Sequence, residues 1–251
     1  MPFEFYLGTH MYSWLYREDI KVPLFVSYRR LQFVRRLKSA VTNWALDSGG
    51  FTELNMFGEW RTSSAQYADA VRRLQAEVGN LDFVAPQDWM CEPVVLAKTR
   101  RTVSEHQDLT ILNFKDLRDQ LGPIVIPVLQ GWTKDEYFRC VDKYFEAGVD
   151  LNTEPRVGIG SVCRRSATSE IKDLLLSLSF LKLHAFGVKK RGLVGVSDKL
   201  RSSDSLAWAY GAWKLGQPLP ECLGGTHKNC ANCFRYALKW RAELLAMIGT
   251  V

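Results

Sequence analysis

Short apolar runs, each ending in a polar or glycine-bearing loop and followed by a helical pattern, recur along most of this chain. We expect strands at 3–7, 24–28, 44–47, 83–85, 124–129, 156–162 and 181–188. We expect helices at 65–78, 92–108, 113–120 and 168–179, one between Thr133 and Gly148, and one near the C-terminus. Alternating strands and helices are typical of a parallel sheet with helical crossovers. The sequence therefore predicts an α/β fold. We favour a closed (β/α)8 TIM barrel over a doubly wound sheet.

The chain changes in character at Gly216-Gln217-Pro218-Leu219-Pro220, and a cysteine-rich turn then precedes the last helical pattern. With 251 residues the chain is long enough to bury a full core. We expect a barrel domain over residues 1–215. Residues 216–251 are expected to form a Cys/His turn and a C-terminal helix that packs on the barrel.

An acidic residue and two glycines close the third expected strand, in the stretch Asp47-Ser48-Gly49-Gly50-Phe51. Glycine adopts backbone angles that other residues avoid, and it lets a flat ligand approach the main chain. A carboxylate at the carboxyl end of a buried strand stands where α/β enzymes keep catalytic groups. The alternative is an Asx turn that closes an ordinary strand.

Polar side chains also follow other expected strands, and in a barrel these strand ends converge on one mouth. They are His10, Asp47, Gln87, Asp88, Gln130, Ser161 and Asp204. Any one alone could be a turn residue or a helix cap, and Asp204 before Leu206-Ala207-Trp208 fits an N-cap. Together they favour a functional site. If Asp47 and Asp204 faced one sugar carbon there, they would suit displacement at that carbon, one as nucleophile and one as acid/base.

The C-terminal turn has the spacing of a metal site, Cys222-x4-His227-x2-Cys230-x2-Cys233. Three thiols and an imidazole, ending in a Cys-x2-Cys pair at a helix start, suit tetrahedral Zn²⁺. Because the expected chemistry lies elsewhere, the ion would be structural. The spacing leaves open whether His227 is a ligand, and the alternative is a cysteine-containing turn without metal. A single histidine, His184, alternates with apolar neighbours and is interpreted as a satisfied core residue.

The formal net charge is +6, and many basic residues stand side by side. These groups are Arg29-Arg30, Arg35-Arg36, Arg72-Arg73, Arg100-Arg101, Arg164-Arg165 and Lys189-Lys190-Arg191. They could line a phosphate-binding face, or they could form a solvated basic surface. No apolar run predicts a membrane span and the N-terminus lacks the pattern of a signal peptide, so we expect a cytoplasmic protein.

These residues together resemble a known family, the tRNA-guanine transglycosylases. Asp47-Ser48-Gly49-Gly50-Phe51 resembles its Asp-Ser-Gly-Gly-Phe signature, and Gln130-Gly131 resembles its Gln-Gly base-binding motif. Gly158-Ile159-Gly160-Ser161-Val162 is similar to its glycine-rich loop, and Phe186-Gly187-Val188 to its Gly-Val strand end. Asp88 falls where the family has an acid that reads the base edge. The matches keep the family's order over roughly residues 40–210.

The departures from that pattern point to one branch. The family's nucleophile stretch, Asp-Cys-Val-x-Pro-Thr-Arg, corresponds here to Ser203-Asp204-Ser205-Leu206-Ala207-Trp208, so the nucleophile assignment depends on Asp204 alone. The family's zinc motif, Cys-x-Cys-x2-Cys with a distant His, also differs from the present spacing. The chain is much shorter than the tRNA enzymes. These features resemble the compact DpdA-like branch, which inserts 7-deazaguanines into DNA and occurs in phages and bacterial modification clusters.

The resemblance implies a TIM barrel that exchanges guanine in DNA for a 7-deazaguanine such as preQ0, through a covalent aspartyl–sugar intermediate. Asp204 would attack C1′, and Asp47 would deprotonate the incoming base. The implied base-binding residues are Ser48, Gly49, Gly50, Phe51, Asp88, Gln130, Gly131, Gly160 and Ser161. The implied partners are DNA rather than tRNA and a free 7-deazaguanine, in the cytoplasm of a bacterium or a phage-infected host. A homodimer or a partner protein is left open.

Three alternatives remain. The same exchange could act on tRNA, although the short chain leaves no room for a separate tRNA-binding domain. A base-releasing glycosidase could use the same carboxylates with water as acceptor. From a different class, the chain could be a zinc-bearing nucleic-acid-binding protein without activity.

Overall fold

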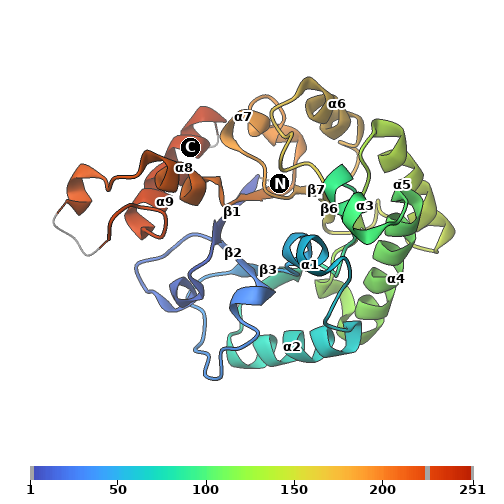
Figure 1. Cartoon of the computed structure of the whole chain (residues 1–251), viewed down its shortest axis with the longest axis horizontal. Helices are drawn as coiled ribbons and strands as arrows, with labels where there is room; N and C mark the ends of the chain where they lie inside the picture. Colours follow the sequence, from blue (N-terminus) through green and yellow to red (C-terminus); the bar gives the residue numbers. More distant parts are fainter. Residues whose placement is uncertain (1–2, 224–226, 250–251) are drawn as a thin grey trace.

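The computed structural model describes residues 3–223 and 227–249, in which eight parallel strands form one curled sheet in the order β4-β3-β2-β1-β8-β7-β6-β5. The strands are β1 (Glu4–Thr9), β2 (Leu24–Ser27), β3 (Trp44–Asp47), β4 (Leu81–Val84), β5 (Val128–Leu129), β6 (Val157–Ile159), β7 (Leu183–Ala185) and β8 (Ser202–Ser205). The end strands meet where Val84 bridges in parallel to Val125 and the Ile126 amide donates to the Val84 carbonyl over 3.1 Å. The predicted (β/α)8 barrel is confirmed, and Figure 1 shows helices around the strands.

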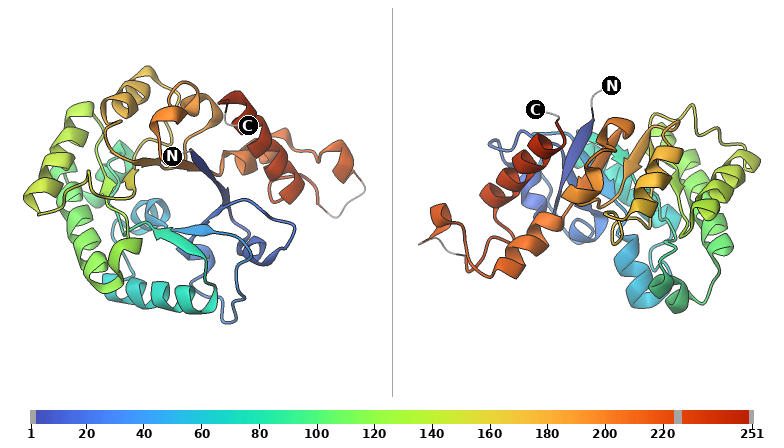
Figure 2. Two further views of the ribbon diagram at one scale, coloured as in Figure 1. Left: turned by 180° about the vertical axis from the view of Figure 1, so that it is seen from behind. Right: turned by 90° about the horizontal axis from the view of Figure 1, so that it is seen from above.

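The helices differ in length around the barrel. They are α1 (Gly50–Phe57), α2 (Ser64–Glu77), α3 (Pro93–Thr99), α4 (Val103–Leu121), α5 (Lys134–Glu146), α6 (Ser169–Ser177), α7 (Lys190–Leu193), α8 (Ala207–Leu215) and α9 (Phe234–Met247). After β1 and β2 the chain forms only short 3-10 turns, η1 (Tyr12–Tyr16) and η2 (Tyr28–Arg30), followed by loops. Figure 2 shows α1 and α3 at one end of the barrel, where they form part of the wall around its mouth. No helix in the described ranges is both long and apolar enough to cross a membrane.

Two of the sequence-based element assignments are wrong. The helices expected at 92–108 and 113–120 are instead α3 and α4, because the break falls at Arg100, whose φ is +56°, and Thr102 starts α4 with a capping box to Glu105. The strand expected at 124–129 shrinks to β5, because η3 (Gly122–Ile124) precedes it and Pro127 has no amide hydrogen for the sheet.

The period of two along each strand separates an outer from an inner set of side chains. The outer set, such as Leu7, Trp44 and Leu46, packs under the helices in the main core. The inner set fills the barrel with the cluster of Tyr6, Phe25, Ala45, Phe83 and Ile126, against which Phe186 packs. The interior is therefore a packed core, and the layer nearest the carboxyl ends of the strands faces open space.

The C-terminal helix α9 covers the barrel beside β1. The rings of Phe5 and Trp240 lie 6.1 Å apart, and Ala237 and Leu244 are fully buried in the main core. Figure 2 shows the cysteine-bearing segment between α8 and α9 projecting from the side of the barrel. The boundary proposed at residues 215 and 216 remains a prediction.

Candidate active site

A cavity of about 600 Å³ opens at the carboxyl ends of the strands and brings together most of the predicted site residues. Those that line it are Asp47, Gly49, Gly50, Phe51, Asp88, Gly160, Ser161 and Asp204. Its volume suits a nucleobase with its sugar. A second, open hollow of about 750 Å³ lies near Glu4 and Asp82 at the opposite end, where barrel enzymes do not keep their catalytic groups.

Asp47 is the last residue of β3 and stands half-buried beside Ser27 of β2. Burial raises its pKa to about 6, and the nearby Asp204 charge adds to the rise. The Ser27 hydroxyl and the Gly49 amide act in the opposite direction. Gly49 has φ of +85°, and a Cβ there would lie 2.7 Å from the Arg29 side chain. The tight turn after Asp47 therefore requires glycine.

Asp204 lies inside β8 and not at a helix start, so the N-cap alternative is wrong. Helix α8 begins three residues later, with Leu206 as its N-cap. Asp204 is only 5% exposed, and its Oδ1 accepts a hydrogen bond from the Gly187 amide at 2.9 Å. Burial raises its pKa to about 7, against the lowering effect of the Gly187 amide. A group with this pKa is poised between acid and nucleophile near neutral pH.

Asp88 follows β4, and two buried side chains hold it from behind. The Gln130 amide nitrogen donates to Oδ2 at 2.5 Å, and the Ser48 hydroxyl lies 3.4 Å from Oδ1. Burial and then the charge of Asp47 raise the pKa of Asp88 to about 7. In the described part of the chain, Gln130 and Ser48 do not line the cavity. They orient the carboxyl group that does.

The glycine-rich loop after β6 completes this wall. The Ser161 hydroxyl lies 2.7 Å from Gln130 Oε1 and 3.0 Å from Glu92 Oε2, and it accepts from the Cys91 amide. A Cβ on Gly160 would lie 2.2 Å from Gln130 Nε2, so only glycine leaves Gln130 in place. The expected base-binding residue Gly131 lies elsewhere. A Cβ on it would meet the first turn of α5, which indicates a packing role.

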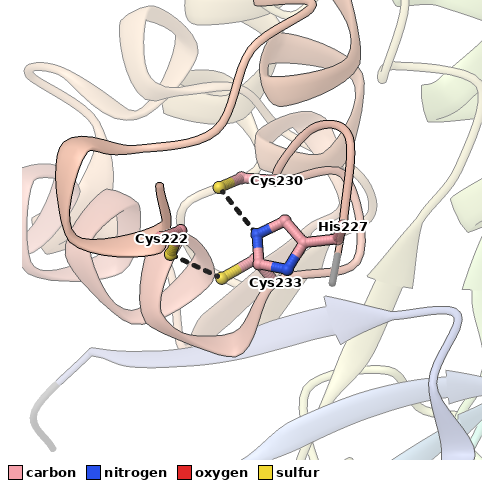
Figure 3. A group of neighbouring side chains, drawn as sticks. All are labelled: Cys222, His227, Cys230 and Cys233. Carbon is pink, nitrogen blue, oxygen red and sulfur yellow. Dashed lines mark hydrogen bonds between the residues drawn. The ribbon is translucent and has the colours of Figure 1, made fainter. Parts of the chain in front are cut away.

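The predicted cluster of Cys222, His227, Cys230 and Cys233 is assembled beside α9 (Figure 3), with one potential ligand atom per residue and all four within 4.8 Å of one another. Tetrahedral zinc with Zn–S bonds of about 2.3 Å places sulfurs about 3.8 Å apart and sulfur about 3.6 Å from nitrogen. The Cys222 and Cys233 sulfurs are 3.8 Å apart, and His227 Nε2 lies 3.5 Å from the Cys230 sulfur. The donor set and its dimensions fit a tetrahedral metal ion.

Two further features of this cluster suit a metal ion. The Leu219 amide donates to the Cys230 sulfur at 3.3 Å. Burial and the neighbouring Cys233 and Cys230 thiols raise the pKa of Cys222. Ionised thiols this close together repel one another. A metal cation between the sulfurs would offset that repulsion and stabilise the thiolate form that binds metals.

The family model for DpdA, described as DeoxyPurine in DNA protein A, matches residues 1–250. The chain belongs to the DpdA family. No curated protein matches it. The family match therefore covers both the barrel and the Cys/His cluster.

Sequence reasoning missed several residues of this DpdA-family cavity. Glu92 is 2% exposed and lines it, and burial raises its pKa. Because Glu92 precedes Pro93, it has the pattern of an ordinary helix start. Met90 and Phe25 also line the cavity. In the sequence these two apolar residues have only the pattern of core residues, so nothing predicted that they line the cavity.

The basic pairs of this DpdA-family chain do not share one face. On the outer helix α2, Arg72 pairs with Asp69 and Arg73 with Glu77, within the helix itself. These two arginines are therefore committed to local ion pairs and stand away from the cavity.

Two other pairs lie at the cavity. Arg30 lines it and lies 3.2 Å from His10 Nδ1, and the neighbouring Arg29 pairs with Glu53. The Arg164 guanidinium lies 4.5 Å from the centre of the Phe51 ring. The mouth thus carries positive charge next to its aromatic wall.

Proposed function

We propose that this chain exchanges guanine in DNA for a free 7-deazaguanine base through a covalent aspartyl–sugar intermediate. One observation carries the proposal. Asp47 of β3 and Asp204 of β8, the candidate base and nucleophile, line the same cavity as Asp88 and Gly160. The family description, which names deoxypurine in DNA, supports DNA over tRNA as the polymer.

In the first half-reaction, an Asp204 oxygen forms a bond to C1′ of the guanosine nucleotide as the C1′–N9 bond breaks. The electron pair of the broken bond leaves on guanine N9, which takes a proton from Asp47. Burial raises the pKa of Asp47, which favours the protonated form that this step uses. The sugar stays covalently bound while the bases exchange.

The second half-reaction reverses these steps with the new base. Asp47, now ionised, removes the N9 proton of the 7-deazaguanine. The N9 electron pair attacks C1′ and displaces the Asp204 carboxylate. One carboxylate serves as nucleophile and one as alternating acid and base, as in retaining glycoside hydrolysis. No proton is gained or lost in the full cycle.

Asp88 is placed to read the edge of guanine that carries N1–H and the 2-amino group. Each carboxylate oxygen can accept two hydrogen bonds, so the contacts with Ser48 and Gln130 leave room for those of the base. Guanine and 7-deazaguanines share this edge, so one wall can hold both the leaving and the incoming base. The Phe51 ring offers a face for stacking beside it.

A guanine in duplex DNA must leave the stack to reach this cavity, which costs roughly a few kcal/mol. Arginines that bind the flanking phosphates offset that cost. Arg30 and Arg164 are exposed and stand next to the cavity, so they are the proposed phosphate contacts. For the Cys/His cluster we propose Zn²⁺ in a structural role.

Arg30→Gln should weaken DNA binding and reduce the slope of log K against log salt by about 1, because one phosphate contact is lost. Arg72→Gln is the matched control, since Arg72 pairs with Asp69 on α2. The measurement is fluorescence anisotropy with labelled duplex DNA over a salt series. Equal slopes for both variants would remove Arg30 from the DNA interface.

The function itself is tested by base exchange with purified protein. Radiolabelled guanine in duplex DNA, and in parallel in tRNA, is offered with preQ0, and release of label is followed. We expect release from DNA that depends on preQ0. Release from tRNA alone would assign the chain to tRNA modification, release without any acceptor base would indicate a glycosidase, and no release from either polymer would contradict the proposal.

A further inference from the structure

His184 of β7 is fully buried inside the barrel, one layer below the cavity. Its ring contacts four aromatic rings, those of Tyr6, Phe25, Phe83 and Phe186. The interpretation of His184 as a satisfied core histidine holds for only one of its nitrogens. Nδ1 lies 2.8 Å from the Ser202 hydroxyl, whereas Nε2 makes no hydrogen bond with any described residue.

The unbonded nitrogen lies close to the candidate nucleophile. His184 Nε2 lies 3.4 Å from Asp204 Oδ1, close enough for an ion pair but outside hydrogen-bond geometry. Register explains the approach, because His184 stands opposite Ser202 across β7 and β8, and Asp204 follows two residues later on the same inner face. Contacts of this kind shorten when substrate closes the site.

The neighbours of Nδ1 decide which nitrogen carries the hydrogen. Arg156 donates to the Ser202 hydroxyl oxygen at 2.5 Å, and a guanidinium can only donate. Among the described contacts of Ser202, His184 Nδ1 is the acceptor that remains for the Ser202 hydrogen. Nδ1 therefore accepts, and the hydrogen of the neutral ring sits on Nε2, facing Asp204.

The charges around this ring keep it neutral. Burial, and then the positive charge of Arg156, which directly precedes β6, hold the pKa of His184 far below its usual value. Glu4 of β1 acts against this, and it is itself bound by Arg156 at 3.0 Å and by Arg201 at 3.2 Å. Among the described residues, Asp204 of β8 is the charged group that lies 3.4 Å from Nε2 of this ring. A neutral ring can donate to Asp204 without becoming its ion-pair partner.

We propose that His184 is a positioning residue whose Nε2–H, together with the Gly187 amide, holds Oδ1 of Asp204 and leaves Oδ2 as the oxygen that attacks C1′. The Gly187 amide already donates to the same Oδ1 at 2.9 Å. Two donors on one oxygen fix the carboxylate plane and lower the electron density of that oxygen, so the other is the better nucleophile. This inference rests on the proposed base exchange.

The bond changes follow from that assignment. Oδ2 forms the bond to C1′ as the C1′–N9 bond breaks, and the electron pair leaves on guanine, which Asp47 protonates. His184 neither gains nor loses a proton. Its contribution is to the orientation of Asp204, which affects the chemical step more than the binding of DNA.

His184→Phe should lower kcat about 10- to 100-fold and leave KM for DNA nearly unchanged, since a group that acts through another is lost. Phe83→Leu is the packing control, because Phe83 contacts the His184 ring at 4.9 Å between ring centres without contacting Asp204 in the described structure. Equal losses of kcat in the two variants would show that His184 only fills space, which overturns the proposal.

A spectroscopic readout needs no activity. The chain has four histidines, so ¹⁵N-labelled imidazoles can be assigned one by one. We expect a protonated Nε2 and an unprotonated Nδ1 for His184, and a shift of the Nε2 signal in Asp204→Ala. The opposite tautomer, or an unchanged signal in that variant, would overturn the inference even in an active enzyme. A wild type that exchanges no base but shows the expected signals would contradict the proposed function alone.

Discussion

Asp204→Asn should lower base exchange by more than about 10³-fold while the protein keeps its fold, because an amide cannot serve as the nucleophile at C1′. The substitution conserves size, and the amide oxygen can still accept from Gly187. Exchange of labelled guanine measures the loss, and trapping of a covalent DNA–protein adduct measures the intermediate. Both signals are expected to disappear together.

The matched control is Asp82→Asn. Asp82 also lies on a barrel strand, but it contacts the Tyr6 hydroxyl at 2.9 Å and lies at the opposite hollow. This control should retain most of the activity. Near-normal turnover in Asp204→Asn would show that Asp204 is not the nucleophile, regardless of the activity of Asp82→Asn.

Asp204→Asn also has an expected effect on the stability of the fold. The folded-state pKa of Asp204 is raised to about 7 from an ordinary 3.8, so the native state binds the proton more tightly than the unfolded chain does. Below about pH 4 the Asp204 carboxyl is protonated in both states and does not lower the free energy of unfolding. As the pH rises toward 7 it lowers that free energy increasingly, by at most about 4 kcal/mol for a pKa difference of about three units between the two states. Asp204→Asn should therefore melt above the wild type at pH 8, with a smaller difference at pH 5. Scanning calorimetry at both values tests this.

Cys230→Ser should lower both metal content and thermal stability. Cys230 is 1% exposed, lies against His227 and accepts from the Leu219 amide, so its loss opens the cluster on two sides. Loss of a structural metal costs on the order of 3 kcal/mol or more, or roughly 6–12 °C in Tm for a chain of this size. Metal analysis of the purified protein and a thermal melt measure the two effects.

Cys163→Ser is the control for that experiment, because Cys163 lines the cavity and lies outside the Cys/His cluster. It should keep the metal content of the wild type. If the wild type carries no metal and melts at the same temperature as Cys230→Ser, the zinc proposal is wrong. The rate of base exchange in Cys230→Ser should fall only in proportion to the fraction of protein that is unfolded.

Local sequence patterns predicted much of this protein because they act over a few residues. Apolar runs predicted seven of the eight strands. Gly49 predicted the turn after Asp47, because glycine readily adopts the φ of +85° that position 49 has. The Cys-x2-Cys pair predicted the Cys/His cluster because one turn of chain brings both sulfurs together. These features depend on backbone geometry and short spacing, which a sequence displays directly.

Other features were decided by tertiary structure alone. Strand β8 consists of Ser-Ser-Asp-Ser, which has no apolar pattern, and it becomes a strand because β1 and β7 pair with it on both sides. Only that pairing turns Asp204 from an apparent helix cap into an inward-facing carboxyl. The same packing puts Gln130 behind Asp88 and brings His184 Nε2 to 3.4 Å from Asp204 Oδ1, across 42 and 20 positions of sequence. The burial that raises the pKa of Asp204, and the partners that orient it, come from strands distant in the chain, so no local pattern could reveal them.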